Sequence, residues 1–509
     1  MNRKLHGLVL AAFLLIFGFA GFTQQDSVVI SLSLQNPQTH TVHVTLQYKA
    51  TAAKTVFKMP NWTPGYYQLM HYAEQVTQFS AFDENNNPLA WEHSNANTWE
   101  VHTQPKKKVT LQYNVIADSA FVATSFIDST HAYITPAATF LYVENQIQLP
   151  VSLNVLSYEK WSRVATGLDS IAGQQFQYTA PDFDMLYDCP ILAGNLEELP
   201  SFKVGGVTHR FIGHRLADFN KQDFMNDLKK IVTASYNIMN DIPYQHYTFL
   251  GIGPGNGGIE HLTSSANSFT GAELNNENGR KSILSFLAHE YFHNYNVKRI
   301  RPIELGPFDY EHGSKTNQLW ISEGWTVYYE YLLLARAGIL SANDLYKNFQ
   351  VNILAYEKHN GRLVQSLSQS SSETWNDGPF GNDKNKTISY YDKGPVVALL
   401  LDFEIRHQTK NTKSLDDVMR LLYQKFYKEK QRGFTEKEFW AACESIAGTS
   451  LTTIYNYVHS TEELNYQKYL AYAGLNIDAQ NRSFAVTPVA NPDSLQQKIL
   501  ASWLIGSSN

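Results

Sequence analysis

The chain has 509 residues, of which 43% are hydrophobic and 17% are charged, and its formal net charge is −6. This length predicts two or three domains, and this composition excludes an intrinsically disordered protein. The longest basic run is only Lys106–Lys108. Because nucleic-acid-binding proteins need a dense cationic surface, we expect no nucleic acid as the main partner.

The first residues have the pattern of a secretory signal peptide. Two basic residues precede an apolar run, Leu8–Phe19, whose length is typical of a signal-peptide core and short for a membrane span. Ala20 offers a cleavage site and Thr23 a second one. We therefore expect a signal peptide over residues 1–23 and a periplasmic or extracellular mature protein, with an uncleaved anchor as the alternative. No later apolar stretch is long enough for a span, so we expect no stable membrane insertion after cleavage.

Only two cysteines are present, Cys189 and Cys443. Two cysteines exclude a disulfide framework and a cysteine-rich zinc site. A single bridge is compatible with an oxidising compartment, but two buried thiols are favoured. Any metal in this protein must therefore be held by histidine and carboxylate side chains.

Residues 24–200 have the pattern of an antiparallel β domain. Short alternating segments such as Val28–Leu34, Thr41–Tyr48 and Val109–Ile116 are separated by turn clusters such as Asp83–Pro88. This alternation predicts strands with one face on a core.

Residues 201–476 have mainly helical patterns, which makes the whole chain a multidomain α+β protein. Phe219–Asn240 carries apolar residues at helical spacing, and a short strand is predicted at His246–Ile252. Further helices are predicted at about Gly279–Val297, Ser322–Arg336, Gly394–Arg406, Ser414–Lys428 and Thr435–Ile446. A short tail follows over residues 477–509, with a closing helix expected at Ser494–Leu504.

The strongest chemical signal is the run His289-Glu290-Tyr291-Phe292-His293. Residues four apart lie on one face of a helix, so both imidazoles can reach one metal ion. Glu290 can then act as the general base that takes a proton from the attacking water. The pattern could also arise by chance in a chain with 17 histidines, but zinc is favoured.

A catalytic zinc ion needs a third protein ligand and one open position. No histidine follows His293 before His312, so the candidates are carboxylates. Glu323 is favoured because its neighbours are apolar and aromatic; Glu330, Asp309 and Glu311 remain alternatives. A lone glutamate near a helix start is more often a solvated charge.

Two separated motifs resemble the glycyl aminopeptidase family of exported zinc peptidases. They are His289-Glu-Tyr-Phe-His-Asn-Tyr-Asn-Val-Lys-Arg-Ile-Arg-Pro302 and Leu319-Trp-Ile-Ser-Glu-Gly-Trp-Thr-Val-Tyr-Tyr-Glu330, and Met59–Tyr66 also matches. The resemblance implies a thermolysin-like catalytic domain over residues 201–476 with Glu323 as the third zinc ligand. Members of the family typically carry a PDZ domain after this region, and the tail of this chain is expected to be too short for one.

The run Gly257-Gly258-Ile259-Glu260-His261 is similar to the edge strand with which aminopeptidase N-type enzymes hold their substrates. The likeness implies that the backbone pairs with an extended peptide while Glu260 binds the free α-amino group. The alternative is a turn followed by an ordinary surface glutamate.

The run Ser389-Tyr390-Tyr391-Asp392-Lys393-Gly394 resembles a Tyr-x-Lys-Gly motif of the same enzymes. The resemblance assigns to Tyr391 the role of a hydrogen-bond donor to the developing oxyanion, and Tyr390 remains the alternative.

Together these residues predict an aminopeptidase that depends on one zinc ion and acts on peptides. The family resemblance implies a preference for small N-terminal residues such as glycine or alanine. Two other interpretations are a zinc endopeptidase, in which Glu260 is only structural, and a non-enzymatic peptide-binding protein that retains the fold. Cleavage of an N-acetylated peptide distinguishes the aminopeptidase from the endopeptidase.

Overall fold

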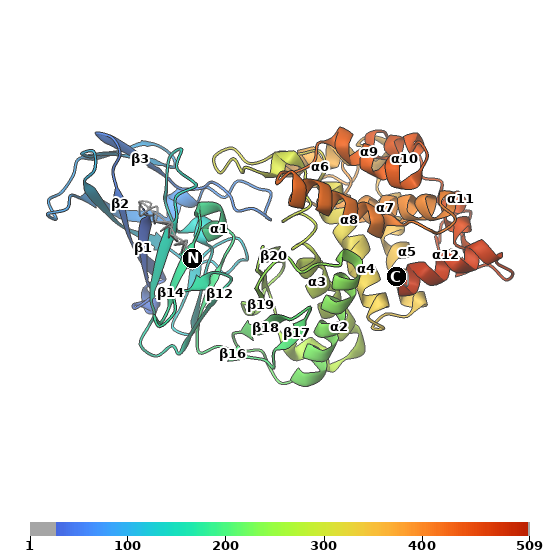
Figure 1. Cartoon of the computed structure of the whole chain (residues 1–509), viewed down its shortest axis with the longest axis horizontal. Helices are drawn as coiled ribbons and strands as arrows, with labels where there is room; N and C mark the ends of the chain where they lie inside the picture. Colours follow the sequence, from blue (N-terminus) through green and yellow to red (C-terminus); the bar gives the residue numbers. More distant parts are fainter. Residues whose placement is uncertain (1–26, 507–509) are drawn as a thin grey trace, which may run out of the picture.

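The computed structural model describes residues 27–506, which form a β-rich N-terminal part beside a largely helical part (Figure 1). The expected signal peptide lies outside the described residues. Within residues 27–506, no helix combines the length and the hydropathy that a membrane span requires.

Three sheets build the N-terminal part. The largest has the strand order β13-β14-β11-β1-β2-β7-β4, and two smaller sheets have the orders β10-β3-β6-β5 and β12-β15-β9-β8. The predicted strands are confirmed to within one residue as β1 (Val28–Ser33), β2 (Thr41–Lys49) and β7 (Lys108–Ile116). Alternate residues of all three strands are buried, as expected for a sheet with one face on a core.

The expected antiparallel pairing holds in these three sheets with one exception. β1 runs parallel to β11 (Val151–Leu156), whereas the other pairs of these three sheets are antiparallel. Two neighbouring parallel strands need a long connection. Here the chain from β2 to β10 supplies it. The other elements of this part are β3 (Lys54–Lys58), β4 (Val76–Phe82), β5 (Trp91–Asn95), β6 (Thr98–His102), β8 (Phe126–Ile127), β9 (His131–Ile134), β10 (Tyr142–Val143), β12 (Arg163–Thr166), β13 (Asp169–Ser170), β14 (Gln177–Ala180), α1 (Phe183–Tyr187) and β15 (Ile191–Gly194).

A six-stranded sheet begins the second part and has the order β16-β18-β19-β21-β20, with β17 also paired to β18. β18 (Val207–Gly213), β19 (His246–Gly251) and β21 (Ser264–Asn267) are parallel, and β20 (Gly258–Glu260) lies antiparallel to β21 at the edge. The remaining strands are β16 (Glu197–Glu198) and β17 (Phe202–Val204). One edge of β20 therefore has no strand neighbour in this sheet.

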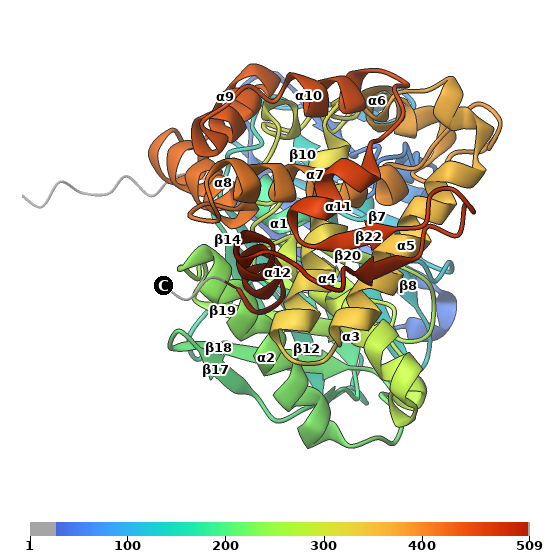
Figure 2. The same ribbon diagram turned by 90° about the vertical axis from the view of Figure 1, so that its right-hand side faces the viewer.

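Helices make up most of the rest of the chain. They are α2 (Lys221–Met239), α3 (Glu277–Phe292), α4 (Thr326–Arg336), α5 (Ala342–Lys358), α6 (Leu367–Asp377), α7 (Tyr390–Gln408), α8 (Leu415–Leu422), α9 (Glu436–Ala447), α10 (Thr452–His459), α11 (Tyr466–Tyr472) and α12 (Ser494–Ile505). A two-stranded sheet, β22 (Leu475–Ile477) and β23 (Val486–Pro488), precedes α12. The expected closing helix is confirmed as α12, which lies beside α4 (Figure 2). Its Trp503 donates a hydrogen bond to Tyr328 of α4.

Four predicted helices differ in detail from the structure. The predicted helix Gly394–Arg406 begins earlier, as α7, and the predicted helix Ser414–Lys428 is divided into α8 and a π-helical segment, η8 (Tyr423–Glu429). The predicted helix Gly279–Val297 ends early, at Phe292. The chain turns after His293, and the carbonyl of Asn296 accepts a hydrogen bond from Nδ1 of His293. The predicted helix Ser322–Arg336 begins instead with a wide π-helical turn, η6 (Trp320–Trp325), before α4. Such turns are common at functional sites.

Each part buries an aromatic side chain in the core of the other part. Trp62 of the N-terminal part is fully buried in the core of the helical part, and its indole donates to the carbonyl of Asp309 at 2.7 Å. In return, Tyr310 belongs to the core of the β domain and donates to Asp184 at 2.6 Å. This exchange places the segment that follows Trp62 against the helical part.

Candidate metal centre and active site

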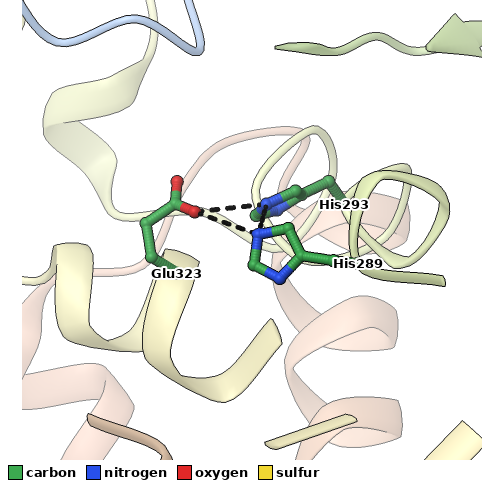
Figure 3. Close-up of side chains that lie close together, drawn as sticks. All are labelled: His289, His293 and Glu323. Atoms are coloured by element: carbon green, nitrogen blue, oxygen red, sulfur yellow. Dashed lines mark hydrogen bonds and ion pairs between the residues drawn. The ribbon is translucent and has the colours of Figure 1, made fainter. Parts of the chain in front are cut away.

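His289 and His293 project from one face of α3 toward Glu323 in η6 (Figure 3). The two Nε2 atoms are 3.0 Å apart, and they lie 3.5 Å and 3.2 Å from Oε2 of Glu323. The side chains of His293 and Glu323 are almost completely buried, and that of His289 is 12% exposed. The structure therefore brings together the three residues that the sequence suggested as ligands.

Neighbouring acceptors determine which nitrogen of each imidazole carries the proton. Nδ1 of His289 lies 2.9 Å from a carboxylate oxygen of Glu330, and Nδ1 of His293 lies 2.7 Å from the carbonyl of Asn296. Both partners can only accept, so each Nδ1 donates. The lone pair of each Nε2 then points at the shared centre.

This donor set fits a zinc ion. Without a positive charge at this centre, two nitrogen lone pairs and a carboxylate oxygen would face one another in a buried space, which is electrostatically unfavourable. Tetrahedral zinc with bonds of roughly 2.0–2.1 Å places its ligand atoms about 3.3 Å apart. The three observed separations, 3.0 Å, 3.2 Å and 3.5 Å, are close to this value.

The electrostatics of the cluster also favour a cation. Burial opposes the charged form of the imidazoles, but the neighbouring carboxylates prevail and raise the pKa of both His289 and His293. Conversely, the imidazoles hold the pKa of Glu323 below its ordinary value, although burial opposes this.

The other carboxylates that the sequence left open lie elsewhere. Asp309 accepts hydrogen bonds from the backbone of Glu311 and His312, and Glu311 pairs with Lys58 at the contact with the β domain. Glu330 reaches the centre only through Nδ1 of His289, and its other oxygen accepts from Ser285 at 2.6 Å. Asp309 and Glu311 thus have other partners, whereas Glu330 contacts the cluster through His289.

Tyr391 and Tyr390 have different hydrogen-bond partners in the structure. The Tyr391 hydroxyl donates to Oε2 of Glu323 at 2.8 Å, whereas the Tyr390 hydroxyl lies 3.1 Å from Thr374 and is fully buried. Burial, followed by the charge of Glu323, raises the pKa of Tyr391, so its hydroxyl keeps its proton at neutral pH. Tyr391 is therefore the tyrosine of the pair whose hydroxyl lies beside His289, His293 and Glu323.

Two glycines allow this approach. A Cβ added at Gly324 would lie 2.6 Å from Cα of Gly394, and one added at Gly394 would lie 2.8 Å from Cα of Gly324. Backbone atoms this close leave no room for a methyl group. The contact joins η6 to α7 and brings Tyr391 to Glu323.

Glu290 and Glu260 lie at the edge strand β20. A Cβ at Gly258 would meet the carboxyl group of Glu290 at 2.6 Å, so Glu290 packs directly on the strand backbone. Burial raises the pKa of Glu290 to about 7. Glu260 is 4% exposed, and its Oε1 has no hydrogen-bond partner among the described residues. His261, in contrast, turns toward Asp188, with Nδ1 3.3 Å from the carboxylate.

A cavity of about 690 Å³ opens beside the candidate metal centre and is lined by Gly257, Gly258, His289, Glu290 and Tyr391 among others. Its size is within the range of sites that enclose small molecules. A larger cavity of about 1,030 Å³ is lined by residues of α2, α4 and α8 but by none of the predicted site residues. The smaller cavity is therefore the one relevant to the chemistry.

Two contacts of this site were not predicted from the sequence. The hydroxyl of Tyr67, which follows the Trp62 anchor, donates to Oε1 of Glu323 at 3.3 Å. Lys298 lies 2.8 Å from Asp188 and 3.8 Å from Glu260. Tyr67 and Asp188 belong to the N-terminal part. The family resemblance of Met59–Tyr66 was the signal in the sequence that this part contributes residues to the site.

Comparison with known families gives two matches. The N-terminal domain of M61 peptidases matches residues 30–195, and the M61 glycyl aminopeptidase domain matches residues 282–397. Together these matches span more than half of the chain. No curated protein sequence gives a significant match.

Solved structures with the same fold come from several organisms. An aminopeptidase N family protein from Idiomarina loihiensis is 26% identical, with a TM-score of 0.84 over 89% of this chain and 79% of that chain. An M1 zinc metallopeptidase from Deinococcus radiodurans is 11% identical, with a TM-score of 0.52 over 86% of this chain and 95% of that chain. Yeast LTA4 hydrolase in complex with bestatin is 13% identical, with a TM-score of 0.53 over 88% of this chain and 70% of that chain. The last two similarities concern the fold alone.

Proposed function

The chain belongs to the M61 glycyl aminopeptidase family and is therefore a zinc metallopeptidase, and we propose that it removes small N-terminal residues such as glycine or alanine from peptides. We assign His289, His293 and Glu323 as the ligands of one zinc ion per chain. A bound zinc ion would polarise the scissile carbonyl and acidify an adjacent water.

The proposal rests above all on the arrangement along β20. Glu260 and Gly258 are two residues apart on this strand and so face the same side. Glu290, next to the ligand His289, packs on Gly258. A peptide whose α-amino group binds Glu260 and whose backbone pairs with β20 brings its first peptide bond to Glu290.

Three side chains would carry the chemistry. Glu290 accepts a proton from the attacking water and then delivers it to the leaving amine. Tyr391 donates a hydrogen bond to the oxyanion that develops on the carbonyl oxygen. Glu260 holds the ammonium group by a charge-assisted hydrogen bond, which selects the end of a peptide over its middle.

The loop after Trp62 supports the preference for small residues. A Cβ at Gly65 would meet the carboxylate oxygens of Glu260 at 3.0 Å and 3.2 Å, so the loop backbone covers the proposed ammonium site closely. We propose that this close cover disfavours a large first side chain. His261 faces Asp188 instead of the cavity, so we propose that it positions the end of β20 and does not bind substrate directly.

Turnover of glycyl- and alanyl-p-nitroanilide tests the proposal. We expect release by the zinc-loaded protein, and a loss of about 10²–10⁴-fold in Glu290→Gln, which keeps the shape of the side chain. Removal of zinc by a chelator should abolish release, and added zinc should restore it. Cleavage of N-acetyl-alanyl-p-nitroanilide as fast as the free amine would instead favour an endopeptidase.

We further propose that the protein is exported, on the pattern of residues 1–23 alone. Sequencing of the mature N-terminus from fractionated cells tests this, with a start after Ala20 or Thr23 expected. An intact Met1 in the cytosolic fraction would contradict it.

A further inference from the structure

The direction in which a bound peptide extends from the metal centre follows from the edge strand. β20 runs from Gly258 to Glu260. A peptide paired antiparallel to it therefore starts at Glu260 and proceeds past Gly258. Because Gly257 and Gly258 line the 690 Å³ cavity and Glu260 does not, the residues after the scissile bond enter this cavity.

Two helices form the walls of this cavity. α3 contributes Lys281 and Ser285, and α5 contributes Asp344 and Lys347. The charge of Lys281 is already paired with two carboxylates, since its Nζ lies 2.8 Å from Glu277 and 3.2 Å from Asp344. Lys347 is exposed and has no hydrogen-bond or ion-pair partner within residues 27–506. It is therefore the lysine of this cavity whose charge is available to a ligand.

The position of Lys347 along α5 sets the length of chain that can reach it. Asn352, in the middle of α5, donates from its side chain to the carbonyl of Tyr391 and so marks where this helix contacts the catalytic residues. Lys347 lies five residues earlier, about 7.5 Å along the axis at 1.5 Å per residue. An extended peptide advances about 3.3–3.6 Å per residue. A substrate of two or three residues that extends along α5 from Asn352 toward Lys347 would span this distance.

We infer that Lys347 binds the free α-carboxylate of short substrates, so that di- and tripeptides are the preferred substrate class of this site. The inference rests on the proposed aminopeptidase function and on the direction given by Glu260. A substrate of this kind is held at both termini, by Glu260 at its ammonium group and by Lys347 at its carboxylate. Longer or amidated peptides lack the second contact.

The test compares alanyl-alanine with alanyl-alaninamide, and trialanine with its amide, under identical conditions. For the wild-type protein we expect a KM about three- to tenfold lower for each acid than for its amide, the range of a partly exposed charge pair. Lys347→Met should raise the KM of the acids to that of the amides and leave kcat and the amides unchanged. Lys347→Arg should keep most of the discrimination, and added salt should weaken it in the wild type.

The matched control is Lys358→Met, which removes another exposed lysine of α5 that does not line the cavity. It should leave all four KM values unchanged. Equal KM values for acids and amides in the wild type, or equal effects of Lys347→Met on both, would overturn the inference while leaving the aminopeptidase function intact. A zinc-loaded wild type that cleaves none of the four peptides would instead refute the function on which the inference rests.

Discussion

Asp188 of the N-terminal part pairs with Lys298 of the helical part at 2.8 Å, and both side chains are buried. The same Lys298 lies 3.8 Å from Glu260, the proposed ligand of the substrate amino group. Asp188 also accepts from the backbone of Leu262 at 2.6 Å. By holding Lys298 and the end of β20, Asp188 keeps the charge of Glu260 available to a substrate.

Asp188→Asn should weaken both the protein and its affinity for free amines. Breaking a buried ion pair costs about 3–5 kcal/mol, and the released Lys298 can move toward Glu260 and compete with the substrate ammonium group. We expect a lower free energy of unfolding and a KM for alanyl-p-nitroanilide raised several-fold, with kcat less affected. Asp182→Asn is the matched control, because an asparagine still caps α1. A KM equal to that of the wild type would show that Lys298 does not reach Glu260.

The same pair predicts a loss of stability in acid. Burial favours the neutral form of Asp188, but Lys298 and His261 prevail and lower its pKa to about 2, from an ordinary 3.8. This lowered pKa contributes about 2 kcal/mol above pH 4, which is lost as the pH falls through about 2. Urea unfolding from pH 5 to pH 2 should therefore show a shallower acid dependence in Asp188→Asn than in the wild type. Parallel curves would contradict the assignment.

Glu330→Gln should lower the affinity for zinc. Glu330 accepts the proton of His289 Nδ1 at 2.9 Å, which orients the ring and makes its Nε2 a better ligand. Loss of such a partner typically weakens metal binding by about 10–100-fold. Competition with a chelating indicator measures this, and we expect the remaining zinc-loaded fraction to retain turnover. Unchanged affinity would mean that the packing of α3 alone orients His289.

Tyr391→Phe and Tyr390→Phe form an internal comparison. Removing a donor to the oxyanion costs about 10²–10³-fold in kcat, so this loss is expected for Tyr391→Phe with little change in zinc content. Tyr390→Phe removes only a hydrogen bond to Thr374 and should cost about 1 kcal/mol of stability. The reverse pattern would transfer the catalytic role to Tyr390.

Much of the fold followed from local patterns. The alternation over Val28–Leu34 and Val109–Ile116 predicted strands, and the apolar spacing over Phe219–Asn240 predicted a helix, because these periods are properties of the backbone. α5 was missed, and with it Lys347. The parallel pairing of β1 with β11 was also missed, since the pattern of a strand does not specify its neighbour.

The sequence by itself determined that His289 and His293 share one face of a helix and that Glu290 lies next to them, because helix geometry sets the positions of residues four apart. Only the tertiary structure decided that Glu323, Tyr391 and Tyr67 meet at the same centre, since these residues come from η6, α7 and the β domain. Their meeting depends on the close contact of Gly324 with Gly394 and on the burial of Trp62 in the neighbouring core. Contacts between residues so distant in sequence arise from the packing of whole elements, which no local spacing encodes.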